Sequence, residues 1–146
     1  MKLTGPQGDF ELNVLDYEYS DSGRFLDRNW LIVSLITKEG EQQCTRTLTF
    51  LSTWELEMLH DCMQSVIDNA ELAPKLTFIE PSLSFCNLSD GKEHYVFRIR
   101  MANDATPGWH DDAGKPYWLP VTPSKEELQQ AVRDLARQLD KFPVRA

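Results

Sequence analysis

The chain has 146 residues, of which 41% are hydrophobic and 26% are charged, and its formal net charge is −8. A chain of this size builds one core without disulfides or metal ions and is too short to require several domains. Its composition excludes a disordered chain, a collagen and a coiled coil, and no apolar run reaches the roughly 18 residues of a membrane-spanning helix. We therefore expect one soluble α+β domain over residues 1–146.

The negative charge is concentrated in the first half of the chain. Residues 1–75 contain six basic and 13 acidic residues, a net charge of −7, whereas residues 124–146 have a net charge of +1. An acidic field repels nucleic acid, because its binding requires lysine and arginine on the phosphates. The same field speeds encounter with a basic partner and aids solubility whether or not such a partner exists.

The first half of the chain reads as three strands. Apolar residues alternate with polar ones over 10–14, which is the period of a half-buried strand. Residues 30–37 are almost all apolar or β-branched, which is typical of a strand covered on both faces. A turn at 38–41 then leads to a third strand over 43–50. Three strands joined in this way predict an antiparallel meander.

A helix follows with a clear beginning. Ser52 and Glu55 have the spacing of a capping box, in which each side chain accepts a hydrogen bond from the backbone of the other residue. Pro74 is expected to end the helix. Its buried stripe is predicted from apolar residues at helical spacing, namely Leu56, Leu59, Met63, Val66, Ile67 and Ala70.

The second half repeats this order. Residues 76–79 and 83–85 read as one strand broken at Pro81, residues 95–101 form the next, and 117–121 form an edge strand that tolerates Pro120. The last helix is capped either by Thr122, with Pro123 at its first position, or by Ser124. The predicted order is βββαβββα: a strongly bent antiparallel sheet, or two three-stranded halves, with one helix after each half. The final helix buries Leu128, Ala131, Val132, Leu135 and Leu139.

The sequence contains no catalytic or metal-binding pattern. The glycine-rich nucleotide motifs and the nucleophile elbow of hydrolases are absent, and the three histidines have no metal-ligand spacing. His110, Asp111 and Asp112 are neighbours on a short loop, an arrangement that rarely aims at one ion. The three cysteines lack a close pair and are interpreted as small buried hydrophobes in a reducing cytoplasm. We expect no enzymatic activity, no cofactor and no metal.

Two segments are candidates for binding a partner. Acidic and tyrosine residues alternate in the first, which comprises Asp16, Tyr17, Glu18, Tyr19 and Asp21. Such a segment suits a basic partner, because tyrosine supplies contact area and carboxylates pair with arginine. It also suits an edge strand that buries one face and solvates the other. The second segment contains Trp109, Asp111 and Asp112. Trp109 is interpreted either as a lid over the core or as an exposed anchor of the kind that interfaces favour.

Several short motifs carry a family resemblance. They are Leu3–Gly5 with Phe10 and Leu12, Asp27–Val33 with Trp30, Leu51–Leu56, Phe78–Phe85, and Pro107 with Trp109. With these motifs the chain resembles the WapI-type immunity proteins of bacterial toxin systems, although Gly108 separates a proline and a tryptophan that tend to be adjacent there. The resemblance implies a cytoplasmic inhibitor that binds one cognate toxin and carries no catalytic residues.

The acidic first half suits a basic toxin C-terminal domain such as a nuclease, because a nuclease must attract phosphates. The alternatives are an interaction or structural domain without a toxin partner, and a small hydrolase whose site is not visible in the sequence. The expected partner is thus a protein, with no binding to nucleic acid or to a membrane.

Overall fold

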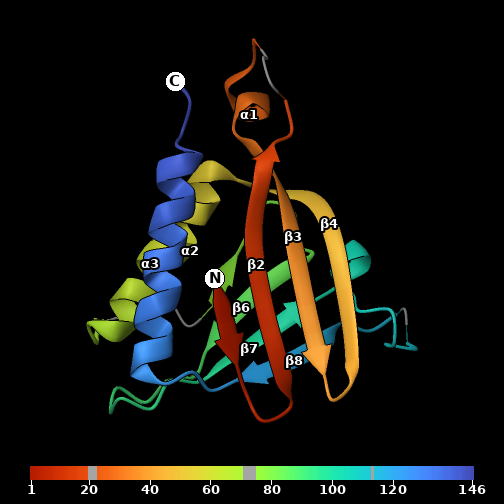
Figure 1. The fold of residues 1–146 in the computed structure, drawn as a ribbon, viewed down its shortest axis with the longest axis vertical. Helices are drawn as coiled ribbons and strands as arrows, with labels where there is room; N and C mark the ends of the chain where they lie inside the picture. Colours follow the sequence, from red (N-terminus) through yellow and green to blue (C-terminus); the bar gives the residue numbers. More distant parts are fainter. Residues whose placement is uncertain (20–22, 71–74, 113) are drawn as a thin grey trace.

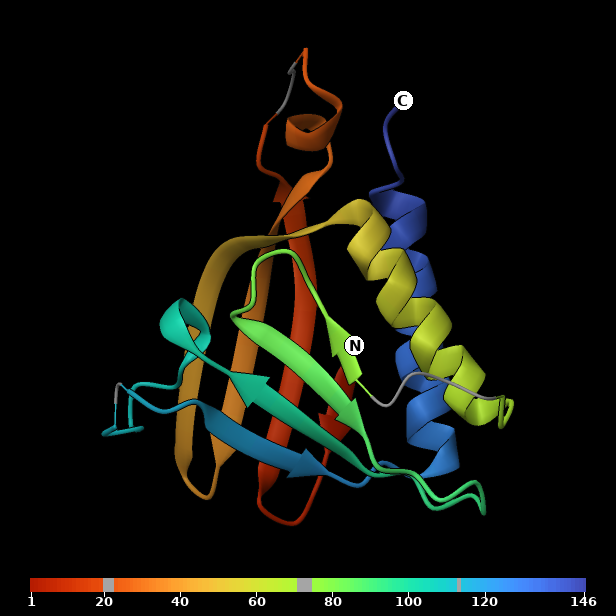
Figure 2. The ribbon, with the colours of Figure 1, turned by 180° about the vertical axis from the view of Figure 1, so that it is seen from behind.

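The computed structural model describes residues 1–19, 23–70, 75–112 and 114–146. Two antiparallel sheets pack against each other, and two long helices lie side by side along one flank of them (Figures 1 and 2). The first sheet consists of β1 (Lys2–Thr4), β2 (Gly8–Tyr17), β3 (Trp30–Glu39) and β4 (Gln42–Ser52), in that order. The second consists of β5 (Lys75–Thr77), β6 (Leu83–Asn87), β7 (Phe97–Met101) and β8 (Tyr117–Val121). The helices are α1 (Phe25–Arg28), α2 (Thr53–Ile67) and α3 (Lys125–Lys141), with a short 3-10 turn, η1, at Asn103–Ala105.

The α+β class is confirmed, with a long helix after each group of strands, but each sheet has four strands rather than three. The prediction of one broken strand over 76–85 was wrong. The chain reverses direction between β5 and β6, so that Leu76 lies opposite Phe85 in an antiparallel pair. The fourth strand of the first sheet is β1, which was not predicted, and neither was the four-residue helix α1.

Strand β3 is covered on one face only, contrary to the prediction from its apolar run. Leu31, Val33 and Leu35 are fully buried, whereas Ile32 and Ile36, on the opposite face, are half-buried. The inward face of the first sheet packs on the second sheet, as shown by the edge-to-face contact of Phe10 with Phe85, 5.8 Å between ring centroids. Its outward face has no layer over it in the described part of the chain (Figure 1).

The capping box at the start of α2 is confirmed. The Glu55 backbone N–H donates to Ser52 Oγ at 3.4 Å, and Glu55 Oε1 accepts from the Ser52 backbone N–H at 3.1 Å. The helix ends at Ile67, before the expected end, and the chain turns at Asn69, whose φ is +56°. Ala70 therefore lies outside the helix and is exposed rather than part of its buried stripe. Pro74 lies outside the described residues.

Helix α3 is capped by Ser124, which settles the choice between the two predicted caps. Ser124 Oγ accepts a hydrogen bond from the Glu127 backbone N–H at 3.1 Å. The Glu127 carboxylate does not fold back onto the cap but accepts from the backbone N–H and the hydroxyl of Thr4, at 2.6 and 2.8 Å. These bonds attach the first turn of α3 to β1, which explains how a three-residue strand is held in place.

The two sheets meet where β1 passes the end of β8. The Thr122 backbone N–H donates to Thr4 O at 2.9 Å. Gly5 allows this approach, because a Cβ at this position would lie 2.7 Å from the carbonyl oxygen of Pro120. Strand β8 is the edge strand that Pro120 predicted.

All three cysteines are free thiols and half-buried, and burial raises the pKa of Cys62. None of the helices in the described ranges has the length and apolar character that a membrane crossing requires.

Candidate functional site

The candidate binding residues lie at opposite ends of β3. Tyr17 pairs with Leu31 at one end, and the indole N–H of Trp109 donates to Glu39 at the other. Glu39 lies eight residue steps along the strand from Leu31, about 27 Å at roughly 3.4 Å per step. The structure therefore does not bring the two candidate segments together. We call the region formed by residues 15–19, α1, the start of α2 and residues 142–146 the upper end, and the region around Glu39 and Trp109 the lower end (Figure 1). Asp21 lies outside the described residues.

At the upper end, Tyr17 is held by the C-terminal segment. The Arg145 guanidinium lies 3.7 Å from the centroid of the Tyr17 ring, and the Tyr17 hydroxyl donates to the carbonyl of Pro143. The ring also makes an edge contact with Phe142, 5.5 Å between centroids. Burial raises the pKa of Tyr17, although the Arg145 charge acts in the opposite direction. Tyr17 is thus an internal contact of the fold.

A fully buried asparagine joins three segments at this end. Asn29 Nδ2 donates to the carbonyls of Phe25 and Arg145 at 2.8 and 3.0 Å, and its Oδ1 accepts from the Arg145 backbone N–H at 2.7 Å. The Asn29 carbonyl accepts from the Thr53 backbone N–H at 2.9 Å. The Arg145 side chain adds hydrogen bonds to the carbonyls of Tyr19 and Arg28. Helix α1, the start of α2 and the C-terminal segment are therefore one assembled unit.

The remaining described members of the first candidate segment are exposed. Asp16 and Glu18 are exposed, and the Tyr19 side chain is 44% exposed. Asp16 accepts a hydrogen bond from the Tyr17 backbone N–H at 2.8 Å, and neither carboxylate forms an ion pair within the described residues. Asp16, Glu18 and Tyr19 are therefore the described members that are accessible to a partner.

Sequence reasoning missed four apolar residues beside this segment. Phe25 and Trp54 are stacked, with ring centroids 5.9 Å apart and planes within 9°. Trp54 is half-buried, while Phe25, Leu26 and Met58 are about half exposed. The only signal in the sequence was the apolar pair at 25–26 within a polar stretch.

At the lower end, two aromatic side chains donate hydrogen bonds to the same carboxylate oxygen. Glu39 Oε2 accepts from the Trp109 indole at 3.1 Å and from the Tyr117 hydroxyl at 2.6 Å. The two rings meet edge to face, 6.0 Å between centroids. Burial, followed by the hydrogen bond to Glu39, raises the pKa of Tyr117 to about 12. Trp109 is half-buried and packs against the core, which is the arrangement of a lid.

Of the two acidic residues beside Trp109, Asp112 interacts with its own loop. Asp111 and Asp112 are exposed. Asp112 accepts from the Gly114 backbone N–H at 3.1 Å and lies 3.7 Å from the Lys115 ammonium, and a His110 ring nitrogen bonds the Lys115 carbonyl at 2.9 Å. Within the described residues, no group of three histidine, cysteine, aspartate or glutamate side chains is placed to hold a metal ion.

Comparison with known proteins identifies the family. The model of the WapI-like immunity protein family matches residues 2–143, which includes every strand and helix described above. The chain belongs to the WapI-like immunity protein family. The comparison with curated proteins gave no match. The resemblance found in the sequence is confirmed, and immunity protein families are generally non-enzymatic.

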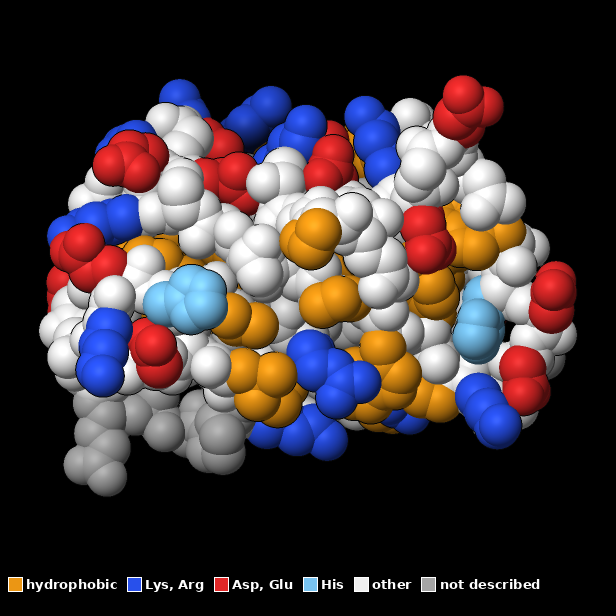
Figure 3. Space-filling view, turned by 90° about the horizontal axis from the view of Figure 1, so that it is seen from below, with side chains coloured by type: hydrophobic (Ala, Val, Ile, Leu, Met, Phe, Trp, Pro, Cys, Tyr) orange, Lys and Arg blue, Asp and Glu red, His pale blue; other side chains and the backbone are white. Residues whose placement is uncertain are grey.

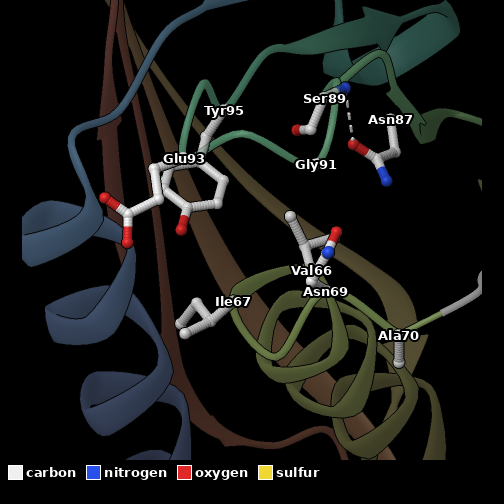
Figure 4. Close-up of a pocket in the computed structure, with 9 residues that line it drawn as sticks. All are labelled: Val66, Ile67, Asn69, Ala70, Asn87, Ser89, Gly91, Glu93 and Tyr95. Carbon is white, nitrogen blue, oxygen red and sulfur yellow. Dashed lines mark hydrogen bonds between the residues drawn. The ribbon is translucent and has the colours of Figure 1, made fainter.

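This WapI-like protein also has a pocket of about 470 Å³ between the end of α2 and residues 87–95 (Figure 4). Val66 and Ile67 form its apolar wall. The ring of Tyr95 is buried, and its hydroxyl points into the pocket without a hydrogen-bond partner among the described residues. The single carboxylate of the lining, Glu93, is paired with Lys125 at 2.9 Å. The lining offers hydrogen bonds but no nucleophile paired with a base, as acyl or phosphoryl transfer would require.

The outward face of the second sheet differs in charge from the rest of this WapI-like protein. Strands β5 to β8 contain Lys75, Arg98 and Arg100 and no acidic residue. The Arg98 guanidinium lies 4.5 Å from the Trp118 ring centroid. In the view from below, Figure 3 shows Lys and Arg side chains among hydrophobic ones in the lower middle, with acidic side chains along the top and toward the sides. The acidic character of the protein is therefore not uniform over its surface.

Proposed function

We propose that this protein protects a bacterial cell by binding one cognate toxin domain stoichiometrically in the cytoplasm and blocking its activity. The observation that carries the proposal is the match of residues 2–143 to an immunity protein family. The partner in this proposal is the C-terminal domain of a toxin, with a basic binding surface. The net charge of −8 supports that choice, because opposite charges steer two proteins together.

The proposed contact is at the upper end. Asp16 and Glu18 are exposed carboxylates without ion-pair partners in the described chain, and Tyr19 lies beside them. Carboxylates of this kind form bidentate pairs with arginine, and tyrosine adds rigid contact area. The Asn29 and Arg145 hydrogen bonds fix the backbone that carries these side chains, so that less conformational entropy is lost on binding. Asp21 belongs to the same proposed contact by its position in the sequence.

A nuclease is the toxin class that fits the charge best. Its substrate site must attract phosphates with lysine and arginine, and an acidic protein bound over that site excludes the substrate. The proposed mechanism is therefore occlusion by a complementary surface. It requires no chemistry from the immunity protein.

The test is protection in cells followed by isolation of the complex. The chain is co-expressed with the toxin domain encoded beside it, and an unrelated toxin domain serves as the control. The proposal predicts that growth is restored only with the cognate domain, and that the two proteins co-purify in a 1:1 ratio. Growth arrest despite full expression of the chain, with no complex recovered, would refute it. If a complex forms but does not depend on Asp16, Glu18 and Asp21, the proposed contact moves to the loop with Trp109, Asp111 and Asp112.

A further inference from the structure

The upper end presents a group of large apolar side chains to solvent. We define the apolar cluster as Phe25 and Leu26 of α1 with Trp54 and Met58 of α2. Phe25, Leu26 and Met58 are 49%, 53% and 45% exposed. Phe25 stacks on Trp54, and Met58 lies one helical turn after Trp54 on the same face of α2. The stacked pair thus joins two segments that are separated by 24 residues in the sequence, and Leu26 and Met58 are exposed neighbours of this pair in their own helices.

Exposed large hydrophobic side chains are concentrated at the upper end. Eight large hydrophobic residues are exposed in the described chain. Six of them belong to the upper end as defined above: Leu15, Tyr19, Phe25, Leu26, Met58 and Val144. Scattered exposed apolar residues need no explanation, but a contiguous group on a soluble protein marks a surface that binds another molecule.

The cluster is held in a fixed geometry. Helix α1 has only four residues, far fewer than an isolated helix needs for stability. Asn29 stabilises this short helix from outside. Its side chain donates to the carbonyl of Phe25 and accepts from the backbone N–H of Arg145, and its own carbonyl accepts from the Thr53 N–H. The exposed rings are thus positioned before any partner arrives, which lowers the entropy lost on binding.

The charged residues around the cluster indicate which surface chemistry a partner needs. Glu57 lies between Trp54 and Met58 in α2, and Asp61 lies one turn further; both are exposed. Asp16 and Glu18 are exposed on the adjoining end of β2. Arg24, which directly precedes Phe25, is also exposed, so the rim is acidic in net charge and not in every residue. An apolar centre with such a rim matches a surface whose apolar centre is surrounded mainly by arginine and lysine, because interfaces combine an apolar core with a polar rim.

We propose that the apolar cluster is the anchor of the toxin contact. It receives an aromatic or aliphatic side chain of the toxin that is flanked by arginine or lysine, while Asp16, Glu18 and Glu57 form the rim. This inference rests on the proposed immunity function and assigns different roles to the apolar cluster and to the carboxylates. The cluster determines how long the complex lasts, and the carboxylates determine how fast it forms.

The experiment compares exposed apolar residues that differ only in location. Leu26→Ser and Met58→Ser alter the cluster, and Leu88→Ser is the matched control, because Leu88 is 50% exposed but lies between β6 and β7 outside the upper end. Dissociation rates are measured with the cognate toxin domain, and melting temperatures establish that each variant folds. Each cluster variant is expected to raise the dissociation rate at least about tenfold, whereas Leu88→Ser changes it less than about twofold.

Three results would overturn the inference. Unchanged dissociation rates for folded Leu26→Ser and Met58→Ser would show that the cluster lies outside the contact, although the immunity function would stand because the wild type binds. A larger effect of Leu88→Ser than of both cluster variants would place the anchor elsewhere. A wild-type dimer that Met58→Ser converts to a monomer would show that the cluster joins two copies of this chain. Absence of any complex with the wild type would instead refute the proposed function itself.

Discussion

The two ends of β3 use similar residue types in different ways. At the lower end, the Glu39 carboxylate accepts hydrogen bonds from both Trp109 and Tyr117, so that the carboxylate and the two aromatic side chains face one another. At the upper end, the hydrogen bonds come from Asn29, Arg145 and the backbone. Carboxylates and aromatic rings there are left on the surface. Aromatic residues that satisfy their polar atoms internally hold the fold, and those left uncovered are available for binding.

The largest expected effect is on stability at the lower end. Trp109→Ala removes a half-buried ring and its bond to Glu39, and should lower the free energy of unfolding by about 2–4 kcal/mol, since truncation of core aromatics costs roughly 3–5 kcal/mol. Urea unfolding measures the change. Loss below about 0.5 kcal/mol would mean that Trp109 is not a lid.

The next largest effect concerns Asn29. Asn29→Ala leaves the carbonyls of Phe25 and Arg145 without their donor, and each buried polar group left unsatisfied costs about 1–3 kcal/mol. The free energy of unfolding should fall by roughly 2–3 kcal/mol, and hydrogen exchange should increase in α1 and in residues 142–146. Faster exchange throughout the chain, with none selective for the upper end, would contradict the role of Asn29 as the link between these segments.

At the lower end of β3, Tyr117 should make the free energy of unfolding depend on pH. The pKa of Tyr117 is raised to about 12 in the folded state, above its unfolded value of 10, because burial and Glu39 favour the neutral hydroxyl. The stabilisation is complete below pH 10 and is lost as the pH rises from about 10 to 12. Chemical unfolding between pH 9 and 12 should show a steeper loss for the wild type than for Tyr117→Phe. Equal slopes would show that folding does not raise the pKa of Tyr117.

The smallest effect on stability, and a large one on kinetics, is expected for the acidic segment. Replacing Asp16, Glu18 and Asp21 by the corresponding amides should change the free energy of unfolding by less than about 1 kcal/mol, because exposed charges contribute little. Association with the toxin should become slower, and its dependence on salt weaker. Association rates of wild type and triple variant at two salt concentrations provide the test. Identical rates at both concentrations would remove the segment from the contact.

The sequence predicted the features that local patterns determine. The Ser52 capping box, the buried stripe of α3 except for the half-buried Leu139, and the edge position of β8 follow from residues that are close in the chain. Strand β1 was missed because its stability depends on Glu127, which is 123 residues away. The β5–β6 pair was read as one strand because both segments are short, and the alternation pattern does not reveal a reversal of direction.

The candidate site was predictable only in part, for the same reason. The acidic and tyrosine-rich segment is visible as composition, but Arg145 covers Tyr17 across 128 residues of chain, and no local pattern indicates that contact. The apolar cluster was missed because exposure is a tertiary property. Met58 lies off the buried stripe predicted for α2, but no local pattern shows that Phe25 and Trp54 stack beside it, because the packing of α1 on α2 creates that contact.

The most direct test of the account is one measurement on two variants, Met58→Ser at the upper end and Trp109→Ala at the lower end. The dissociation rate from the cognate toxin domain is measured for each, at a temperature at which both are folded. The account predicts that Met58→Ser dissociates at least about tenfold faster than wild type, as expected for an anchor residue, whereas Trp109→Ala dissociates at the wild-type rate. Faster dissociation of Trp109→Ala together with a wild-type rate for Met58→Ser would contradict it and place the toxin at the lower end.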